Sequence, residues 1–196
     1  VFIDGLDVSI VSTRQRVDIR YTLDGTVPVA TSPRVEGILR LTSTATVTAK
    51  CFREGKPVSG IAQARFEKVT PLPALAPSAL RPGLRYRYAQ GDWNTLAEYE
   101  AAPVMEEGVS PSCDISLRKQ PDHYGFTFTG YIKVPADGVY TFSTDSDDGS
   151  RLYVHEVPVA DNDGIHGMKK VSGVIALAAG YHPFRVTFFE KSGGDG

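Results

Sequence analysis

Three acidic side chains lie close together on one short stretch of the chain. Asp145, Asp147 and Asp148 occur within residues 138–154, GVYTFSTDSDDGSRLYV, directly before Gly149. Carboxylates crowded onto a turn repel one another unless water, backbone amides, a cation or a ligand neutralises them. This stretch is therefore the first candidate for a binding site.

A second run of oxygen-bearing side chains follows shortly afterwards and ends at Gly164. Calcium takes about six to eight hard oxygen ligands, which two acidic loops lying side by side could supply together with backbone carbonyls. The sequence therefore indicates a candidate calcium site with the ligands Asp147, Asp148, Asp161, Asn162 and Asp163. In the alternative interpretation, Asp147 and Asp163 only cap turns by accepting hydrogen bonds from local amides, as Asp-Gly sequences often do.

A ligand with neighbouring hydroxyl groups, such as a sugar, could complete such a site. Two of its hydroxyl groups can complete the coordination shell of a calcium ion while an aromatic ring stacks on its apolar face. Trp93, in the polar stretch 91–94, is the candidate ring, and packing of this ring into the core is the alternative. His166 follows the second loop and could touch the ligand; the alternative is a surface histidine. The expected ligand-binding residues are Asp147, Asp148, Trp93, Asn162 and His166.

Other metal sites fit the sequence poorly. Asp145, Asp147 and Glu156 occupy positions 1, 3 and 12 of an EF-hand loop, but Gly149 falls at position 5 instead of 6 and both flanks read as strands. The four histidines are dispersed without the HExxH spacing of a zinc site.

No catalytic constellation stands out. We find no serine or cysteine nucleophile with a base. The adjacent pairs Glu106-Glu107 and Asp147-Asp148 do not supply the geometry of glycosidase carboxylates, which must face each other across a sugar. We expect no catalytic residues and no enzyme in this chain alone; an autonomous hydrolase is a minor alternative.

The elements that position these residues read as strands. Val139, Tyr140 and Phe142, and then Leu152 and Val154, show the alternation of half-buried strands on either side of the acidic turn. One short helix is expected at 94–100, with Asn94 as its cap and with Leu96 and Tyr99 on one face. No GxGxxG or GxxxxGK run is present. Further strand-like runs are 6–11, 17–22, 37–41, 46–52, 61–66, 84–88, 125–134, 171–177 and 182–190.

A proline-rich stretch divides the chain. Residues 70–78, TPLPALAPS, hold three prolines, which favour an extended spacer over a helix or a central strand. We expect a small β-sandwich at 1–69, a linker at 70–81 and a second domain at 82–196. The fold class is all-β, with two β-sandwich domains.

Composition excludes several classes of protein. The 196 residues are 41% apolar and 22% charged, which is typical of a soluble globular protein, and no apolar run is long enough to insert into a membrane. Residues 70–196 hold 11 Lys and Arg against 16 Asp and Glu, so nucleic acid is not an expected partner. Cys51 and Cys113 are expected as two unpaired thiols, with a bridge between them as the alternative. Because residue 1 is Val, the chain reads as an excised or processed fragment, and a missing signal peptide says nothing about export.

The first part of the chain resembles a known family. The segment 19–28, IRYTLDGTVP, followed by Thr42, by 45–52, ATVTAKCF, and by 55–59, GKPVS, is similar to the chitobiase/β-hexosaminidase C-terminal domain. The resemblance covers about residues 5–69. It implies a fibronectin-type-III-like sandwich appended to a secreted glycosidase, and no catalytic residues.

The second part resembles the protective-antigen fourteen-kilodalton (PA-14) domain over about residues 82–196. The similar segments are 83–88, GLRYRY, 128–132, FTGYI, 138–154, 161–164, DNDG, 172–173, 179–180 and 188–190, FFE, with Gly193-Gly194. The resemblance implies a β-sandwich or barrel. Adhesins of that family bind sugars through calcium held by an adjacent Asp-Asp pair, often joined by a cis peptide, and Asp147-Asp148 matches this pair. The family normally continues with one more strand beyond the Gly-Gly-Asp-Gly end, so we expect the last strand to be missing here.

Together these resemblances imply a non-catalytic, carbohydrate-binding accessory region of a secreted glycoside hydrolase such as a hexosaminidase, with calcium as a cofactor. The expected partners are a glycan or oligosaccharide and the catalytic domain of the parent protein, and the expected location is secreted, periplasmic or at the cell surface. The alternative is a structural spacer or protein-docking module without affinity for sugar.

Overall fold

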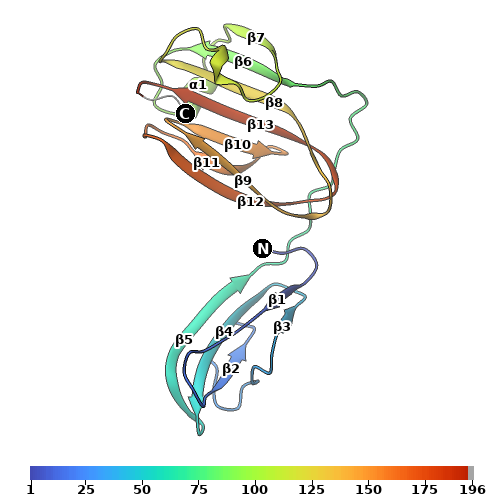
Figure 1. The fold of residues 1–196 in the computed structure, drawn as a ribbon, viewed down its shortest axis with the longest axis vertical. Coiled ribbons are helices and arrows are strands. Elements are labelled where there is room, and N and C mark those ends of the chain that lie inside the picture. The colour runs from blue at the N-terminus through green and yellow to red at the C-terminus, as the bar shows by residue number, and fades with distance from the viewer. Residues whose placement is uncertain (194–196) are drawn as a thin grey trace. The chain divides into compact units, whose positions relative to one another are not determined.

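The computed structural model describes residues 1–193 of a chain that folds as two units, Val1–Thr70 and Pro71–Gly196 (Figure 1). Strands dominate both units, which confirms the all-β prediction. No helix in residues 1–193 is long and apolar enough to cross a membrane. Residues 194–196, at the end where we expected a strand to be missing, lie outside the described residues.

The first unit contains two small antiparallel sheets. One pairs β1 with β3, and the other has the order β2-β4-β5. Phe2, Leu41, Ala45 and Val47 form its buried core, because the alternate residues of β4 point inward. The five strands are β1 (Leu6–Val8), β2 (Asp18–Thr22), β3 (Leu39–Leu41), β4 (Ala45–Arg53) and β5 (Lys56–Phe66).

The second unit has a six-stranded antiparallel sheet in the order β11-β10-β13-β8-β6-β7 and a two-stranded sheet of β12 and β9. Its strands are β6 (Leu84–Gln90), β7 (Glu106–Ser110), β8 (Tyr124–Val134), β9 (Gly138–Ser146), β10 (Ser150–Val154), β11 (Val157–Asn162), β12 (Lys169–Leu177) and β13 (Gly180–Glu190). Its two short helices are α1 (Leu96–Glu100) and a 3-10 turn at Ile115–Leu117.

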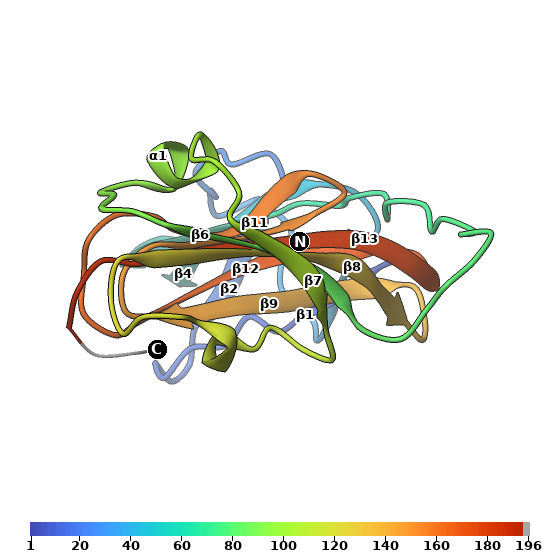
Figure 2. The same cartoon turned by 90° about the horizontal axis from the view of Figure 1, so that it is seen from above.

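Aromatic residues fill the inner face of the six-stranded sheet. Successive strand residues point to opposite faces, so residues two apart share a face. Phe126 and Phe128 stack with ring centroids 5.3 Å apart. The full cluster is Tyr86, Tyr88, Tyr124, Phe126, Phe128 and Phe188. The alternate residues of the same strands, Arg87 and Thr127 among them, form the opposite, outer face, on which α1 lies (Figure 2).

The helix α1 is shorter than expected, and its N-cap lies one residue later than predicted. Thr95, not Asn94, is the N-cap, and its hydroxyl accepts a hydrogen bond from the amide of Glu98. The Asn94 amide instead donates to the carboxylate of Glu98, at 2.7 Å. Leu96 and Tyr99 are both buried, as their spacing predicts.

Part of the predicted linker belongs to the second unit. The Leu72 amide donates to the carbonyl of Ala176, and the Leu75 amide donates to that of Tyr181. The extended backbone that proline favours thus runs alongside the second unit instead of serving only as a spacer. Cys51 and Cys113 are both free, as expected.

Candidate metal centre

The turn between β9 and β10 is formed by Asp147, Asp148 and Gly149. Asp148 has a φ of 54°, in the left-handed region, and is only 2% exposed. A Cβ at Gly149 would lie 2.2 Å from Cε1 of Phe189, so only glycine fits here. The Asp147–Asp148 peptide is not cis, in contrast to the form often found in the resembling adhesins.

The buried carboxylate of Asp148 holds three segments together. Its Oδ1 accepts a hydrogen bond from the amide of His166, at 3.1 Å, and its Oδ2 accepts one from the amide of Lys191, at 2.7 Å. The Asp148 amide in turn donates to the carbonyl of His166, at 2.9 Å. The acidic turn is thereby joined to the loop after β11 and to the residue that follows β13.

A third acidic side chain joins this turn. One carboxylate oxygen from each of Asp147, Asp148 and Glu190 lies within 4.8 Å of the other two. Glu190 is the last residue of β13 and is 1% exposed. Two unit charges about 5 Å apart repel by about 3 kcal/mol at an effective dielectric constant of about 20, so the cluster favours a neutralising cation. The sequence interpretation missed Glu190; the signal was a glutamate that ends an apolar strand, Phe188-Phe189-Glu190.

The carboxylates of the second loop have another partner. Arg151 contacts Oδ1 of Asp161 through Nε, at 2.9 Å, and Oδ2 of Asp163 through a terminal nitrogen, at 3.2 Å. Oδ1 of Asp163 accepts hydrogen bonds from the amides of Leu96, at 2.7 Å, and Gly164, at 2.8 Å. The structure therefore does not bring Asp161 and Asp163 into the cluster. Asp163 instead accepts hydrogen bonds from main-chain amides, as the alternative interpretation predicted.

The electrostatics of Arg151 agree with this arrangement. Partial burial lowers the pKa of its guanidinium, but hydrogen bonds to Asp161 and Tyr153 outweigh that effect, so the pKa is raised above its usual value. The second loop is consequently held by a fixed positive charge that belongs to the protein itself.

Asn162 links the second loop to the turn. Its Nδ2 donates to Oγ of Ser146, at 3.2 Å, and to the carbonyl of Lys169, at 2.9 Å. Ser146 donates from the same Oγ to the carbonyl of Asp148. The Oδ1 atom of Asn162 is buried and has no hydrogen-bond partner within residues 1–193. A buried amide oxygen without a partner is costly, and a cation or water would satisfy it.

The main chain of His166 lies beside the turn, where its amide and carbonyl are hydrogen-bonded to Asp148. Its ring Nε2 is 2.9 Å from the carbonyl oxygen of Asn162, and its Nδ1 is 3.0 Å from that of Gly167. The half-buried ring therefore fastens the loop 162–167, and contact of His166 with a ligand stays a prediction.

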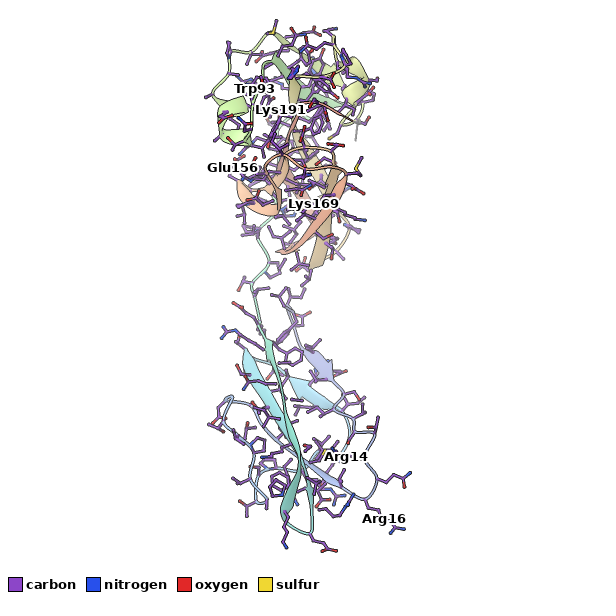
Figure 3. All side chains as sticks on the ribbon, turned by 90° about the vertical axis from the view of Figure 1, so that its left-hand side faces the viewer. Arg14, Arg16, Trp93, Glu156, Lys169 and Lys191 are labelled. Carbon is purple, nitrogen blue, oxygen red and sulfur yellow. The ribbon has the colours of Figure 1, made fainter. Side chains whose placement is uncertain are left out.

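Trp93 is not a stacking platform. Its side chain is 8% exposed and packs with Ala89, Leu96, Tyr99 and Phe189 (Figure 3). The ring centroids of Trp93 and Tyr99 are 5.2 Å apart in an edge-on arrangement. The burial of Trp93 contradicts its interpretation as a ring that stacks on a sugar. The ring packs into the core, as the alternative interpretation predicted.

The donor set suits a hard cation. Three carboxylates and a nearby buried amide oxygen are the oxygen ligands that calcium prefers over the nitrogen and sulfur ligands of zinc. Asp147 and Asp148 thus stay candidate ligands, and Glu190 joins them. The side-chain Oδ1 of Asn162 is a further candidate ligand atom. Asp145 pairs in register with Lys170 and lies exposed on β9, outside the cluster.

Two family models match the chain. Residues 80–195 match the model of the PA14 domain, and residues 2–62 match that of the chitobiase/beta-hexosaminidase C-terminal domain. Both resemblances seen in the sequence are confirmed.

One curated relative and two solved structures are similar to this chain. A beta-hexosaminidase of Porphyromonas gingivalis (strain ATCC BAA-308 / W83) is 27% identical over 183 residues, which are 89% of this chain and 23% of the relative. The chain thus spans about a quarter of the length of this curated relative. Among solved structures, the PA14 domain of the MpAFP antifreeze protein is similar with a TM-score of 0.47 and 17% identity, covering 62% of this chain and 81% of that chain. The GH31 alpha-xylosidase of Xanthomonas citri is similar with a TM-score of 0.43 and 14% identity, covering 94% of this chain and 22% of that one.

Proposed function

Because the chain belongs to the PA14 domain family through residues 80–195, we propose that it is a non-catalytic, carbohydrate-binding accessory region of a glycoside hydrolase. The match of residues 2–62 and the beta-hexosaminidase relative support a hexosaminidase-like parent. The parent's catalytic domain and a location outside the cytoplasm belong to the same proposal.

The observation that carries the proposal is the cluster of Asp147, Asp148 and Glu190. In this proposal the three carboxylates hold a calcium ion, and the buried side-chain Oδ1 of Asn162 completes the protein ligands. A calcium ion held by these residues would bind two neighbouring hydroxyl groups of a sugar. The chain's own residues position this group: Asp148 fixes the turn through two amides, and Ser146 and Asn162 hold the second loop beside it.

The proposal is tested by calorimetry and glycan-array binding with calcium and with a chelator. We expect glycan binding in excess calcium, its loss in chelator, and its loss in Asp147→Asn. Asp145→Asn is the matched control, because it removes a charge from the same hairpin outside the cluster. The absence of glycan binding in excess calcium would overturn the proposal. If deletion of the chain then still lowered the activity of the parent protein, the spacer or docking role would replace it.

A further inference from the structure

A cavity lies on the outer face of the six-stranded sheet, away from the acidic cluster. Its volume is about 300 Å³. Its walls come from the strands β6, β8 and β13, from α1, and from the residues that follow α1. The cavity is at the lower end of the roughly 300–1,000 Å³ that small-molecule sites occupy, which suits a single sugar unit better than an oligosaccharide. We call it the Arg185 cavity.

Arg185 is held in one orientation at the wall of this cavity. Its two terminal nitrogens contact Oε1 of Glu100 and Oε2 of Glu156, each at 2.8 Å, and its guanidinium carbon is 3.8 Å from the ring centroid of Tyr153. The Glu156 side chain, labelled in Figure 3, is mostly exposed, and its ion pair with Arg185 is what holds it at the cavity; His155 and Glu156 form the tight turn between β10 and β11, with φ of 51° and 59°. Paired guanidinium and carboxylate groups place fixed donors and acceptors next to each other.

Two guanidinium and two carboxylate groups line the Arg185 cavity, and Glu107 adds a third carboxylate beside it. Glu100 and Glu156 offset Arg185, and Glu107 lies 3.5 Å from the second guanidinium, that of Arg87. An anionic ligand would find no surplus positive charge here. A neutral ligand with hydroxyl groups fits better, because each hydroxyl can accept from a guanidinium and donate to a carboxylate.

The rest of the wall is apolar and small. Ala89, Ala102 and Val104 line it without polar side-chain atoms. The floor is rigid, because the hydroxyls of Tyr99 and Thr127 are hydrogen-bonded at 2.9 Å in a buried position. Burial raises the pKa of Tyr99 to about 12, so the phenol stays neutral. A ligand for this cavity therefore needs hydroxyl groups on one side and a small apolar group on the other.

We propose that the Arg185 cavity binds, without the help of a cation, one uncharged sugar unit that carries a small substituent ending in a methyl group, such as an acetamido group. The sugar hydroxyls face the Arg185, Glu100 and Glu156 groups, and the methyl of the substituent packs on Ala89, Ala102 and Val104. This inference rests on the proposed carbohydrate-binding function and adds a second subsite to it.

The test is an NMR titration of the chain with N-acetylglucosamine and with glucose in excess EDTA. We expect saturable shifts of the amides of Ala89 and Ala102 and of the Arg185 Nε–H signal with N-acetylglucosamine, and about tenfold weaker binding of glucose, which lacks the apolar group. Ala102→Leu fills the cavity and should abolish the shifts. Ala136→Leu, on the exposed turn between β8 and β9, is the matched control and should leave them unchanged.

Glu156→Gln provides an independent check in case Ala102→Leu disturbs the fold. It keeps the shape of the side chain and should weaken binding about tenfold, because a charged hydrogen-bond acceptor is lost. Saturable binding that neither Ala102→Leu nor Glu156→Gln weakens would overturn the inference, as would the absence of saturable shifts at these residues.

The same titration in Asp147→Asn separates this subsite from the proposed metal centre. Shifts at Ala89 and Ala102 that persist in Asp147→Asn support the Arg185 cavity, even if calcium-dependent glycan binding is never seen. Loss of these shifts in Asp147→Asn would overturn the inference, because the binding would then depend on the acidic cluster.

Discussion

The carboxylate of Asp148 accepts a 2.7 Å hydrogen bond from the main-chain amide of Lys191, 43 residues further along the chain. This bond joins the acidic turn to the end of β13, the strand that also presents Glu190. The proximity of three carboxylates is thus built into the backbone connections of the unit and does not depend on flexible side chains alone.

We expect Asp148→Ala to destabilise the second unit by about 3 kcal/mol, because two buried amides lose their acceptor. Urea unfolding in chelator measures this loss without a contribution from calcium binding. Asp145→Ala, on the exposed side of β9, should change the stability by less than about 0.5 kcal/mol. Equal losses in the two variants would contradict the anchoring role of Asp148.

Addition of calcium should raise the stability of the chain by about 2.7 kcal/mol at a concentration one hundred times the dissociation constant, if the cation binds only the folded state. In Asp147→Asn this gain should disappear. In chelator the same variant should be slightly more stable than the native chain, because one of three neighbouring carboxylate charges is removed. Thermal unfolding with and without calcium gives both values, and a destabilised Asp147→Asn in chelator would argue against repulsion in the cluster.

Stability should fall as the solution becomes mildly acidic, through the pair His155 and His182. Nε2 of buried His182 lies 2.7 Å from the Ala178 carbonyl, so it donates, and Nδ1 of His182 then accepts from Nε2 of His155, also at 2.7 Å. Burial, and then the electrostatic effect of the neighbouring His182 ring, lower the pKa of His155 below its usual 6.5. The unfolded chain therefore binds the proton first, and the stability from this group is complete above pH 6.5 and is lost as the pH falls below it.

Urea midpoints between pH 5 and pH 8 measure this effect. His155→Gln keeps a donor for His182 and removes the titrating ring, so its stability should depend less on pH across that range. A native chain whose pH profile matches that of His155→Gln would refute the assignment.

Gly173→Ala should destabilise the second unit by more than about 3 kcal/mol. A Cβ at Gly173 would lie 1.6 Å from the carbonyl oxygen of Val159, so the backbones of β12 and β11 would have to separate. Gly138→Ala is the matched control, because its Cβ would come no closer than 3.4 Å to the ring of Tyr140. Chemical denaturation of both variants compares them, and similar stabilities would contradict the close approach.

The strands around the acidic turn could be predicted because their signal is local. Alternation in the sequence indicated strands at 138–144 and 151–154, and the structure has them at Gly138–Ser146 and Ser150–Val154. The burial of Leu96 and Tyr99 on one face of α1 could be predicted for the same reason, because residues three apart on a helix lie side by side. Glu190 could not be found in this way, because it reaches the turn through the pairing of β10 with β13, in which Ser150 lies opposite Phe188.

The roles of Asp161 and Asp163 were hidden by a change of strand register. An irregularity between Leu152 and Tyr153 shifts the pairing of β10 with β11, so Arg151 lies opposite Asp161. Without that shift Arg151 would lie opposite Ala160, and nothing in the sequence marks the bulge. Asp161 and Asp163 have the oxygen ligands that calcium prefers, but both form ion pairs with Arg151. Only the three-dimensional pairing of the strands reveals these ion pairs.

Asp163 has a consequence for how the two candidate sites communicate. The loop 162–166 is bound to Asp148 at one end through His166, and at the other end Asp163 binds the first amide of α1, the helix that borders the Arg185 cavity. A ligand at either end of this loop therefore acts on main chain that the other site also contacts. If this loop transmits an effect, the effect is reciprocal: a cation at the acidic cluster changes the affinity for the sugar by the same factor as the sugar changes the affinity for the cation, while the cavity still binds its sugar without a cation.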